Sequence, residues 1–483
     1  MGRFASVILV AVVIAVTLQA QQDVWKARRQ KYPELFRITE LAQSAPPEFA
    51  AWALLRAAES AQLQDRDWQK EMIIQAFDQA ASASLAMKKR IIAASTAAGS
   101  REEQMSNQAY SLALDRISLS TRAVRDMFPL DQQKAREMFQ RIAPPQLTPL
   151  TCADSLVPDV GEYYSAMGMI AVSGFSPEER KHEQHVIFLN AGLGAIRSPA
   201  ELAPAAVMIE RISPALTNEQ LKLLSGALSS ILEKLSGDDR SFSHALADID
   251  SAISALIATA RSRQAGGETL ATSYRGFLVR NLTGARCGES SDDQNLLTQV
   301  IDRFNAGVSS AGDANLRPIG EDETKPGSVG EKAKTQPLFD AAFQEGERQK
   351  LILLMMEKGK GSDDWHDRFE DFLHDVDATK ANPGESDAAF FYRKCGMLAA
   401  VLAVAPPGED RDKTLSQYVT FLTSSSFQQQ SLVEWFGQAK AAAGLAEGKL
   451  METFAASAHP VLQLYAALEQ ALPERPSWAN PPQ

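Results

Sequence analysis

The sequence predicts an all-α protein with no significant β-sheet, and three observations support this fold class. Alanine, the residue with the highest intrinsic helix propensity, is abundant along the chain. Apolar residues recur at helical spacing in most segments, whereas sustained alternation of β-branched and polar residues is not found. The sequence also has no Asn-Gly or Asp-Gly pair of the kind that turns a β-hairpin. We expect about sixteen helices joined by short connections.

Residues 1–20 have the composition of a secretory signal peptide. One charged residue, Arg3, precedes the apolar run ASVILVAVVIAV, and Ala20 suits the last position before a cleavage site. The apolar run is shorter than the roughly 20 residues that a membrane-spanning helix needs. We therefore expect export to the periplasm or the extracellular space. If Ala20 is not cut, the segment remains as a membrane anchor.

The next segments predict helices that are apolar on nearly all sides. In PPEFAAWALLRAAES only Glu48, Arg56 and Glu59 form a narrow polar stripe, and WQKEMIIQAFDQ has a similarly thin one. Such helices must be covered on two or more sides, as they are in stacked antiparallel helix pairs. A second pair of this kind is DAAFFYRKCGMLAAVLAVA with DKTLSQYVTFLTSS. The sequence therefore predicts an α-solenoid. A large multi-helix bundle is the alternative, because no repeat of fixed length is visible.

Helix starts are marked by a Ser or Thr followed three residues later by Glu or Gln. In this capping box each of the two side chains bonds the backbone N–H of the other residue. The pattern occurs at Ser100–Glu103, Ser176–Glu179, Ser198–Glu201, Thr217–Gln220 and Ser291–Gln294. Each occurrence precedes apolar residues at helical spacing, so each predicts the first turn of a helix.

A change in composition divides the chain into two helical regions. Segment 309–336 is rich in Gly, Pro, Ser and charged residues, so we expect a flexible linker or a long loop there. It separates an N-terminal helical-repeat region, 21–308, from a C-terminal helical region, 337–472. The proline-rich tail, 473–483, is expected to be disordered.

The chain has three cysteines, and export would expose them to an oxidising compartment. Cys152 and Cys287 both have turn-forming neighbours, whereas Cys395 lies in an apolar helical stretch. We predict a disulfide between Cys152 and Cys287, with Cys395 buried as a free thiol. The alternative is three unpaired, buried cysteines.

One group of histidines and carboxylates in PEERKHEQHVIF is a candidate for a metal site. Glu179 precedes His182 by three residues, and His185 follows it by three. On a continuous helix Glu178, His182 and His185, at positions i, i+4 and i+7, share one face, and imidazole with carboxylate is a ligand set for transition metals. However, Arg180 and Lys181 bring positive charge into the same turn, which favours a solvated helix face.

A second group, in SDDWHDRFEDFLHDVD, consists of His366, Glu370 and His374 at intervals of four residues. These side chains lie away from the apolar stripe of the same helix, which again favours a solvated face over a dry metal site. Neither group is assigned as a metal site, and no cofactor is predicted.

The search for other chemistry excludes several classes of function. A formal net charge of −11 without a Lys/Arg-rich run argues against nucleic acid as a partner. The sequence has no GxSxG, GxxxxGK[ST], GxGxxG, HExxH or CxxC motif. No catalytic residue is therefore assigned, and the sequence leans away from an enzyme.

Two hypotheses from different classes remain. The favoured one is an exported, non-catalytic helical-repeat protein that binds a protein or peptide partner or acts as a cell-envelope scaffold. The alternative is a helical-bundle metal-binding protein or metalloenzyme that uses the two histidine and carboxylate groups. A deep pocket with converging titratable side chains would favour an enzyme instead.

Overall fold

The structure is a computed structural model that describes most of the chain. The described residues are 23–85, 87–90, 109–152, 154, 156–235, 237, 239–287, 291–311, 316–330, 365–405, 407–445 and 449–472. The predicted signal peptide, the tail 473–483 and the first predicted helix start, at Ser100, lie outside these residues.

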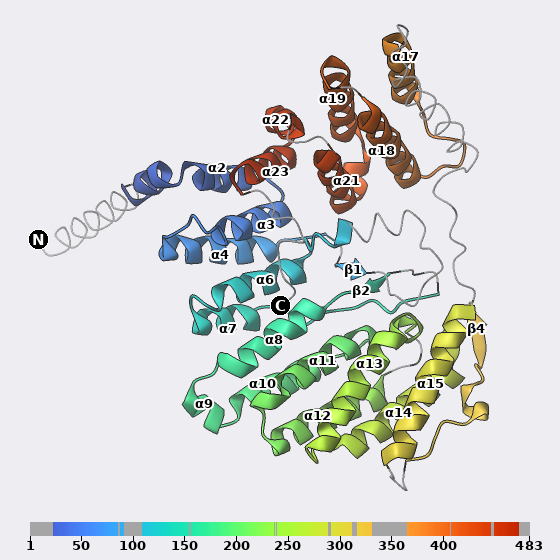
Figure 1. Ribbon diagram of the computed structural model, residues 1–483. Coiled ribbons are helices and arrows are strands. Elements are labelled where there is room, and N and C mark those ends of the chain that lie inside the picture. The colour runs from blue at the N-terminus through green and yellow to red at the C-terminus, as the bar shows by residue number, and fades with distance from the viewer. Residues whose placement is uncertain are drawn as a thin grey trace, which may run out of the picture.

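Helices dominate the described residues, which confirms the all-α fold class (Figure 1). The α-helices up to residue 311 are α2 Pro33–Ala42, α3 Pro47–Ala58, α4 Arg66–Ala80, α6 Arg116–Met127, α7 Gln132–Gln140, α8 Gly161–Ser173, α9 Pro177–Lys181, α10 Gln184–Leu193, α11 Leu202–Ile212, α12 Asn218–Lys234, α13 Ser241–Ser262, α14 Gly267–Thr283 and α15 Ser291–Ala311. Those after residue 364 are α17 Trp365–Ala378, α18 Asp387–Val404, α19 Glu409–Ser424, α20 Phe427–Gln430, α21 Leu432–Leu445, α22 Lys449–Ala456 and α23 Pro460–Ala471.

Short elements complete the fold. They are the 3-10 turns η1 Pro199–Glu201, η2 Ser213–Ala215 and η3 Glu321–Thr324, and the strands β1 Lys89–Arg90, β2 Val157–Pro158, β3 Ala285–Cys287 and β4 Ser328–Gly330. β1 pairs antiparallel with β2, and β3 pairs parallel with β4. The chain forms more helices than the about sixteen expected, since one-turn pieces such as α9 and α20 are separate helices. In the part of the chain described, no helix is both long and apolar enough to cross a membrane.

Three of the predicted capping boxes are present with both hydrogen bonds. They lie at Ser176 before α9, at Ser198 before η1 and α11, and at Thr217 before α12. α15 begins at Ser291, as the fifth pattern predicts. Other helix starts use an aspartate that the pattern does not detect. Asp65 accepts a hydrogen bond from the backbone N–H of Trp68, for example.

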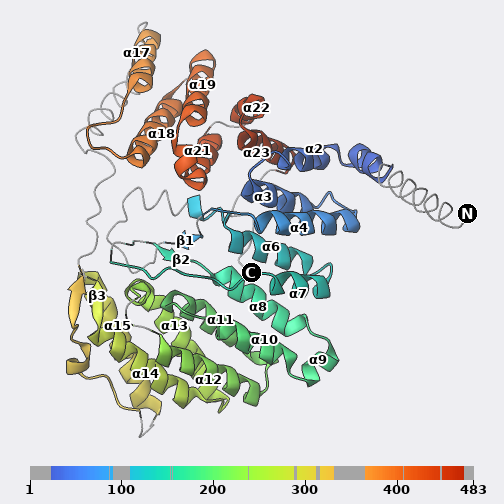
Figure 2. The same ribbon diagram turned by 180° about the vertical axis from the view of Figure 1, so that it is seen from behind.

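From α3 to α15 the helices pack in an ordered succession. α3, α6, α8, α11, α13 and α15 contact one another in that order, and α10, α12 and α14 form a second succession beside them. α4 packs against α3 and α6, and α7 packs against α6 and α8. The same order is visible from the front and from behind (Figures 1 and 2). α3 and α4 are therefore each covered on more than one side, as their thin polar stripes predict.

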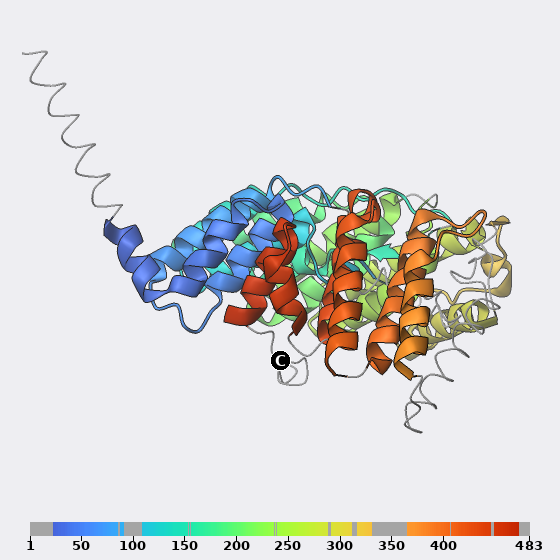
Figure 3. The same cartoon turned by 90° about the horizontal axis from the view of Figure 1, so that it is seen from above.

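The C-terminal helices return to the N-terminal end of this succession. α23 packs against α2 and α3, and the ring centroids of Phe49 on α3 and Phe436 on α21 are 4.9 Å apart. The view from above shows the red C-terminal helices next to the blue N-terminal ones (Figure 3). The two helical regions thus share apolar contacts, a point that their separation in the sequence leaves open.

The polar stripe expected on α3 is not fully exposed. Glu48 is buried, and its carboxylate accepts hydrogen bonds from the backbone N–H of Ser84 at 2.6 Å and of Leu85 at 3.3 Å. The segment after α4 therefore covers this carboxylate. A helical wheel shows which side Glu48 faces but not which loop lies over that side.

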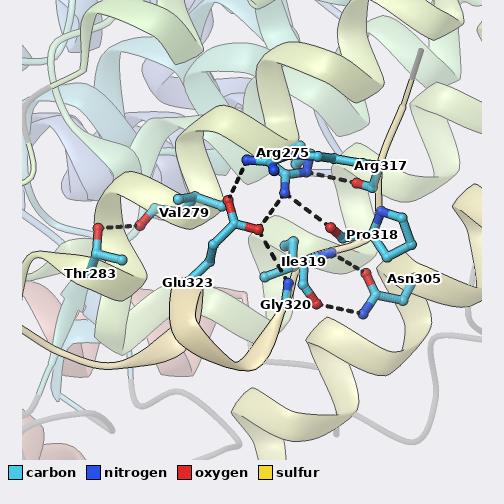
Figure 4. A network of polar contacts seen from close by, with 9 residues as sticks. All are labelled: Arg275, Val279, Thr283, Asn305, Arg317, Pro318, Ile319, Gly320 and Glu323. Atoms are coloured by element: carbon cyan, nitrogen blue, oxygen red, sulfur yellow. Dashed lines mark hydrogen bonds and ion pairs between the residues drawn. The ribbon is translucent and has the colours of Figure 1, made fainter.

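Part of the expected linker, residues 316–330, is anchored on α14 and α15 (Figure 4). Arg275 of α14 donates hydrogen bonds to the carbonyl oxygens of Arg317 at 2.7 Å and Pro318 at 3.0 Å, and to the Glu323 carboxylate at 2.6 Å. Asn305 of α15 bonds the backbone of Ile319 in both directions, at 2.7 and 3.1 Å. Leu316 and Ile319 are also buried.

The sequence left open a flexible linker or a long loop over 309–336, and residues 316–330 form a loop held by side chains of α14 and α15. The composition of a segment cannot show that two isolated apolar side chains find a core, or that side chains of other helices bond its backbone. The first three residues of the expected linker, 309–311, belong to α15.

Candidate functional site

An open pocket of about 910 Å³ lies between α8, α11 and α13. Each helix contributes one stripe of residues three or four positions apart, as expected for one face of a helix. The main lining residues are Glu162, Ser165, Gly168, Met169, Val172 and Ser173 of α8, Ala203, Pro204, Val207, Met208, Arg211 and Ile212 of α11, and Asp248, Ser251, Ala252 and Ala255 of α13. We call it the α8–α11–α13 pocket.

A glycine sets the approach of two pocket walls, and two valines on these walls are exposed to solvent. A Cβ atom on Gly168 would lie 3.0 Å from Cγ of Met208 and 3.1 Å from Cγ2 of Ile212, so this glycine lets α8 approach α11 closely. Within the pocket, Val172 is 37% exposed and Val207 is 40% exposed. Two branched apolar side chains on neighbouring helices are thus left accessible in one concave surface.

Ion pairs flank this apolar surface. Arg125 of α6 contacts Glu162 of α8, with Nη1 and Oε2 2.8 Å apart. Arg90 of β1 pairs with Asp248 of α13. The two acidic groups are therefore neutralised by partners on neighbouring elements, which holds α6 to α8 and β1 to α13.

Two further charged residues line the pocket. Asp159 pairs with Lys88, with 3.2 Å between Oδ2 and Nζ. Arg211, in the last turn of α11, is exposed and has no partner among the described residues. The charged side chains of the pocket thus consist of paired groups and one additional cation.

A buried hydrogen bond sets the distance between two walls of the pocket. The hydroxyl of Tyr164 on α8 donates to Oε1 of Glu201, at the start of α11, over 2.9 Å. The other carboxylate oxygen of Glu201 accepts from the backbone N–H of Arg197 and Ser198. Burial raises the pKa of Glu201 above its ordinary value, although these donors oppose the increase.

A second carboxylate, Asp250 of α13, is fixed in a similar way on the side away from the pocket. It accepts from the hydroxyl of Tyr274 on α14 at 3.1 Å and pairs with Arg303 of α15. Burial raises the pKa of Asp250. These contacts tie α13 to α14 and α15 and so support the third wall.

A pair of carboxylates at the contact between the end of α3 and α6 has perturbed ionisation. Arg122 on α6 donates two hydrogen bonds to Glu59, at 2.9 and 2.8 Å, and its Nε lies 3.9 Å from Oδ2 of Asp126. Burial, together with the charge of Glu59, raises the pKa of Asp126 to about 8. Burial acts in the same direction on Glu59, but the bonds from Arg122 outweigh it and lower the pKa of Glu59. Sequence reasoning missed this pair because the two residues come from different helices.

The structure separates the first candidate metal group. Glu183 has a left-handed conformation, φ 55°, which ends the short helix α9 and begins α10 in a new direction. His182 is exposed, whereas His185 is buried beside the ring of Phe175. Glu179 completes its capping box and pairs with Arg136 at 2.8 Å. His182 and Glu178 contact each other at 3.4 Å, but His185 does not share their face, because the helix is not continuous.

The second candidate group lies on one continuous helix, α17, but its members pair with other residues. His366 contacts Asp410 of α19 at 3.0 Å, and Glu370 pairs with Lys413. His374 is exposed. Within the described residues, no three His, Cys, Asp or Glu side chains are gathered closely enough to hold a metal ion.

Cys152 and Cys287 lie at disulfide distance, with their Cα atoms 5.2 Å apart, as predicted from their turn-forming neighbours. Cys287 belongs to β3, and its partner in the β3–β4 ladder is Gly330 of the anchored segment. Cys395 is buried as a free thiol, and burial raises its pKa.

The pocket could be found only in three dimensions, although each wall leaves a trace in the sequence as a stripe of small and apolar residues interrupted by single charges. No family model, curated protein or solved structure matches this chain. The function is therefore inferred from the pocket and its surroundings.

Proposed function

We propose that this protein is an exported α-solenoid that binds a short segment of a partner protein in the α8–α11–α13 pocket. The observation that carries this proposal is the exposure of Val172 and Val207 in the same concave surface. Apolar side chains lose free energy when they are removed from water, so a surface of this kind gains from being covered.

The succession of helix contacts supports the solenoid architecture. In solenoids each helix pair contacts mainly its neighbours, and the stacked inner helices form an extended binding surface. The contacts α6–α8–α11–α13, with α10–α12–α14 alongside, follow that pattern. The pocket lies on three consecutive members of the first succession.

The chemistry of the pocket supports binding rather than catalysis. A general acid or base needs a side chain that is available to the substrate, with a pKa near the working pH. The three carboxylates that line the pocket, Asp159, Glu162 and Asp248, are each engaged by a lysine or arginine. The titratable groups thus stabilise the pocket rather than converge on a reacting centre.

Two features support export. The apolar segment in residues 1–20 has the length and flanks of a signal peptide. The pairing of Cys152 with Cys287 fits an oxidising compartment, where disulfides persist.

Site-specific photo-cross-linking tests the proposal. A photo-reactive amino acid replaces Val207 in one variant and, as a matched control, Leu223 on α12, which is 50% exposed outside the pocket. The expected result is a cross-link from position 207 to one short segment of one partner protein, and none from position 223. That segment, made synthetically, should bind the purified protein, and Val207→Glu should weaken the binding at least about tenfold.

Several results would overturn the proposal. The pocket is not a peptide site if position 207 cross-links to nothing, or to the same set of proteins as position 223. A partner that binds equally well to Val207→Glu uses another surface, and the protein is then a scaffold without a role for this pocket.

A further inference from the structure

We infer that the segment bound in the α8–α11–α13 pocket carries an aspartate or glutamate side chain that pairs with Arg211. This inference rests on the proposed function and specifies the chemistry of the partner segment.

The charge distribution of the pocket points to an acidic ligand group. The acidic side chains in the lining are neutralised by Lys88, Arg90 and Arg125. Three arginines and three carboxylates line the pocket, but Asp159 pairs with Lys88 from outside the lining. Arg211 is therefore left without an acidic partner among the described residues. An arginine binds a carboxylate well because its planar guanidinium donates two parallel hydrogen bonds.

The position of Arg211 also places this charge next to the apolar surface. Arg211 follows Val207 by four residues on α11, so the two side chains lie one turn apart on the same face of the helix. A segment that covers Val207 with an apolar side chain therefore brings an adjacent residue within reach of the guanidinium.

Hydroxyl groups along the walls suit the backbone of such a segment. Ser165 and Ser173 on α8 and Ser251 on α13 are exposed and have no hydrogen-bond partner among the described residues. A serine hydroxyl can both donate to a carbonyl and accept from an N–H group. The wall formed by α8 from Glu162 to Ser173 is about 16 Å long at helical rise, which equals about five residues of extended chain.

Two pools of synthetic peptides of about seven residues test the inference. The pools have the same randomised apolar positions and differ only at one fixed position, which is Asp in one pool and Asn in the other. We expect the native protein to bind the Asp pool at least about tenfold more tightly than the Asn pool. Arg211→Glu should abolish this preference and should favour a third pool with Lys at the fixed position.

Arg37→Glu is the matched control, because Arg37 is exposed on α2, outside the pocket. This variant should keep the native preference for Asp. Equal binding of the Asp and Asn pools, or an unchanged preference in Arg211→Glu, would overturn the inference and leave the proposed function standing. A stronger preference for phosphoserine than for Asp at the fixed position would show that the ligand group is a phosphate and not a carboxylate. This result would also overturn the inference. If no pool binds and Val207 also gives no cross-link, the proposed function itself fails.

Discussion

Arg56 and Glu469 are 413 residues apart in the sequence, yet Nη1 of Arg56 and Oε1 of Glu469 lie 2.7 Å apart. Both side chains are largely buried, and Arg56 also donates to the backbone carbonyl of Leu472. The guanidinium lies over the ring of Trp52. This contact joins α3 to the end of α23 and fixes the C-terminal helices to the N-terminal end of the succession.

Arg56→Ala should therefore destabilise the protein by roughly 3 kcal/mol, because the variant loses a largely buried ion pair with Glu469 and the hydrogen bond to Leu472. Urea unfolding followed by circular dichroism measures the change. Arg37→Ala, which removes an exposed arginine of α2, should change stability by less than about 0.5 kcal/mol. Equal stabilities of the two variants would show that the contact does not hold the regions together.

The pH dependence of stability should reveal the carboxylate pair of Glu59 and Asp126. The folded state raises the pKa of Asp126 to about 8, well above the ordinary value of 3.8. The unfolded chain then releases its proton at lower pH than the folded chain does. The contribution of Asp126 to stability is therefore full below about pH 4 and is lost as the pH rises towards about 8.

Asp126→Asn keeps the shape of the side chain but cannot ionise. The variant should therefore not lose stability at this position as the pH rises. We expect the melting temperature of the variant, relative to that of the native protein, to rise steadily between about pH 4 and pH 8. Asp302→Asn, at an exposed carboxylate of α15, is the control and should track the native protein at every pH. A difference between Asp126→Asn and the native protein that does not change with pH would contradict the assignment.

The bond between Cys152 and Cys287 closes a loop with a sequence separation of 135 residues. In the chain-entropy model, its removal by Cys152→Ser with Cys287→Ser lowers the free energy of unfolding by about 5 kcal/mol. Dithiothreitol should lower the urea midpoint of the native protein and leave that of the double variant unchanged. A native protein that is insensitive to the reductant, with its thiols shown to be reduced, would exclude a stabilising role.

Arg275 should control the local order of the anchored segment 316–330, since it bonds two backbone carbonyls and Glu323 there. In Arg275→Ala we expect amide hydrogens of this segment to exchange at least about tenfold faster, with little change in the core helices. Arg317→Ala is the comparison, because it removes an exposed side chain that contacts Glu323 at 3.0 Å but bonds no backbone carbonyl of α14 or α15 in the contacts described. Uniform acceleration across all helices would indicate global destabilisation instead.

Much of the local structure could be predicted because its causes are local. The capping boxes at Ser176, Ser198 and Thr217 begin helices as expected, since each box needs only four consecutive residues. The thin polar stripe of α3 correctly indicated a helix covered on several sides. The pairing of Cys152 with Cys287 followed from the contrast between turn and helix neighbours.

Neither the separation of the first candidate metal group nor the α8–α11–α13 pocket could be predicted in the same way. One left-handed residue, Glu183, separates Glu179 and His182 from His185, and no periodic pattern marks that break. No motif in the sequence marks Arg211, and the role proposed for it depends on its position in the α8–α11–α13 pocket.

The sequence by itself determined that this chain forms helices, where several of them begin, and that they must cover one another. These properties follow from propensity, capping and apolar spacing within single segments. Only the tertiary structure decided that α23 packs on α2 and α3, that residues 316–330 lie on α14 and α15, and that α8, α11 and α13 enclose a pocket. Contacts between distant segments depend on how complete helix surfaces fit together, and a local pattern does not contain that information.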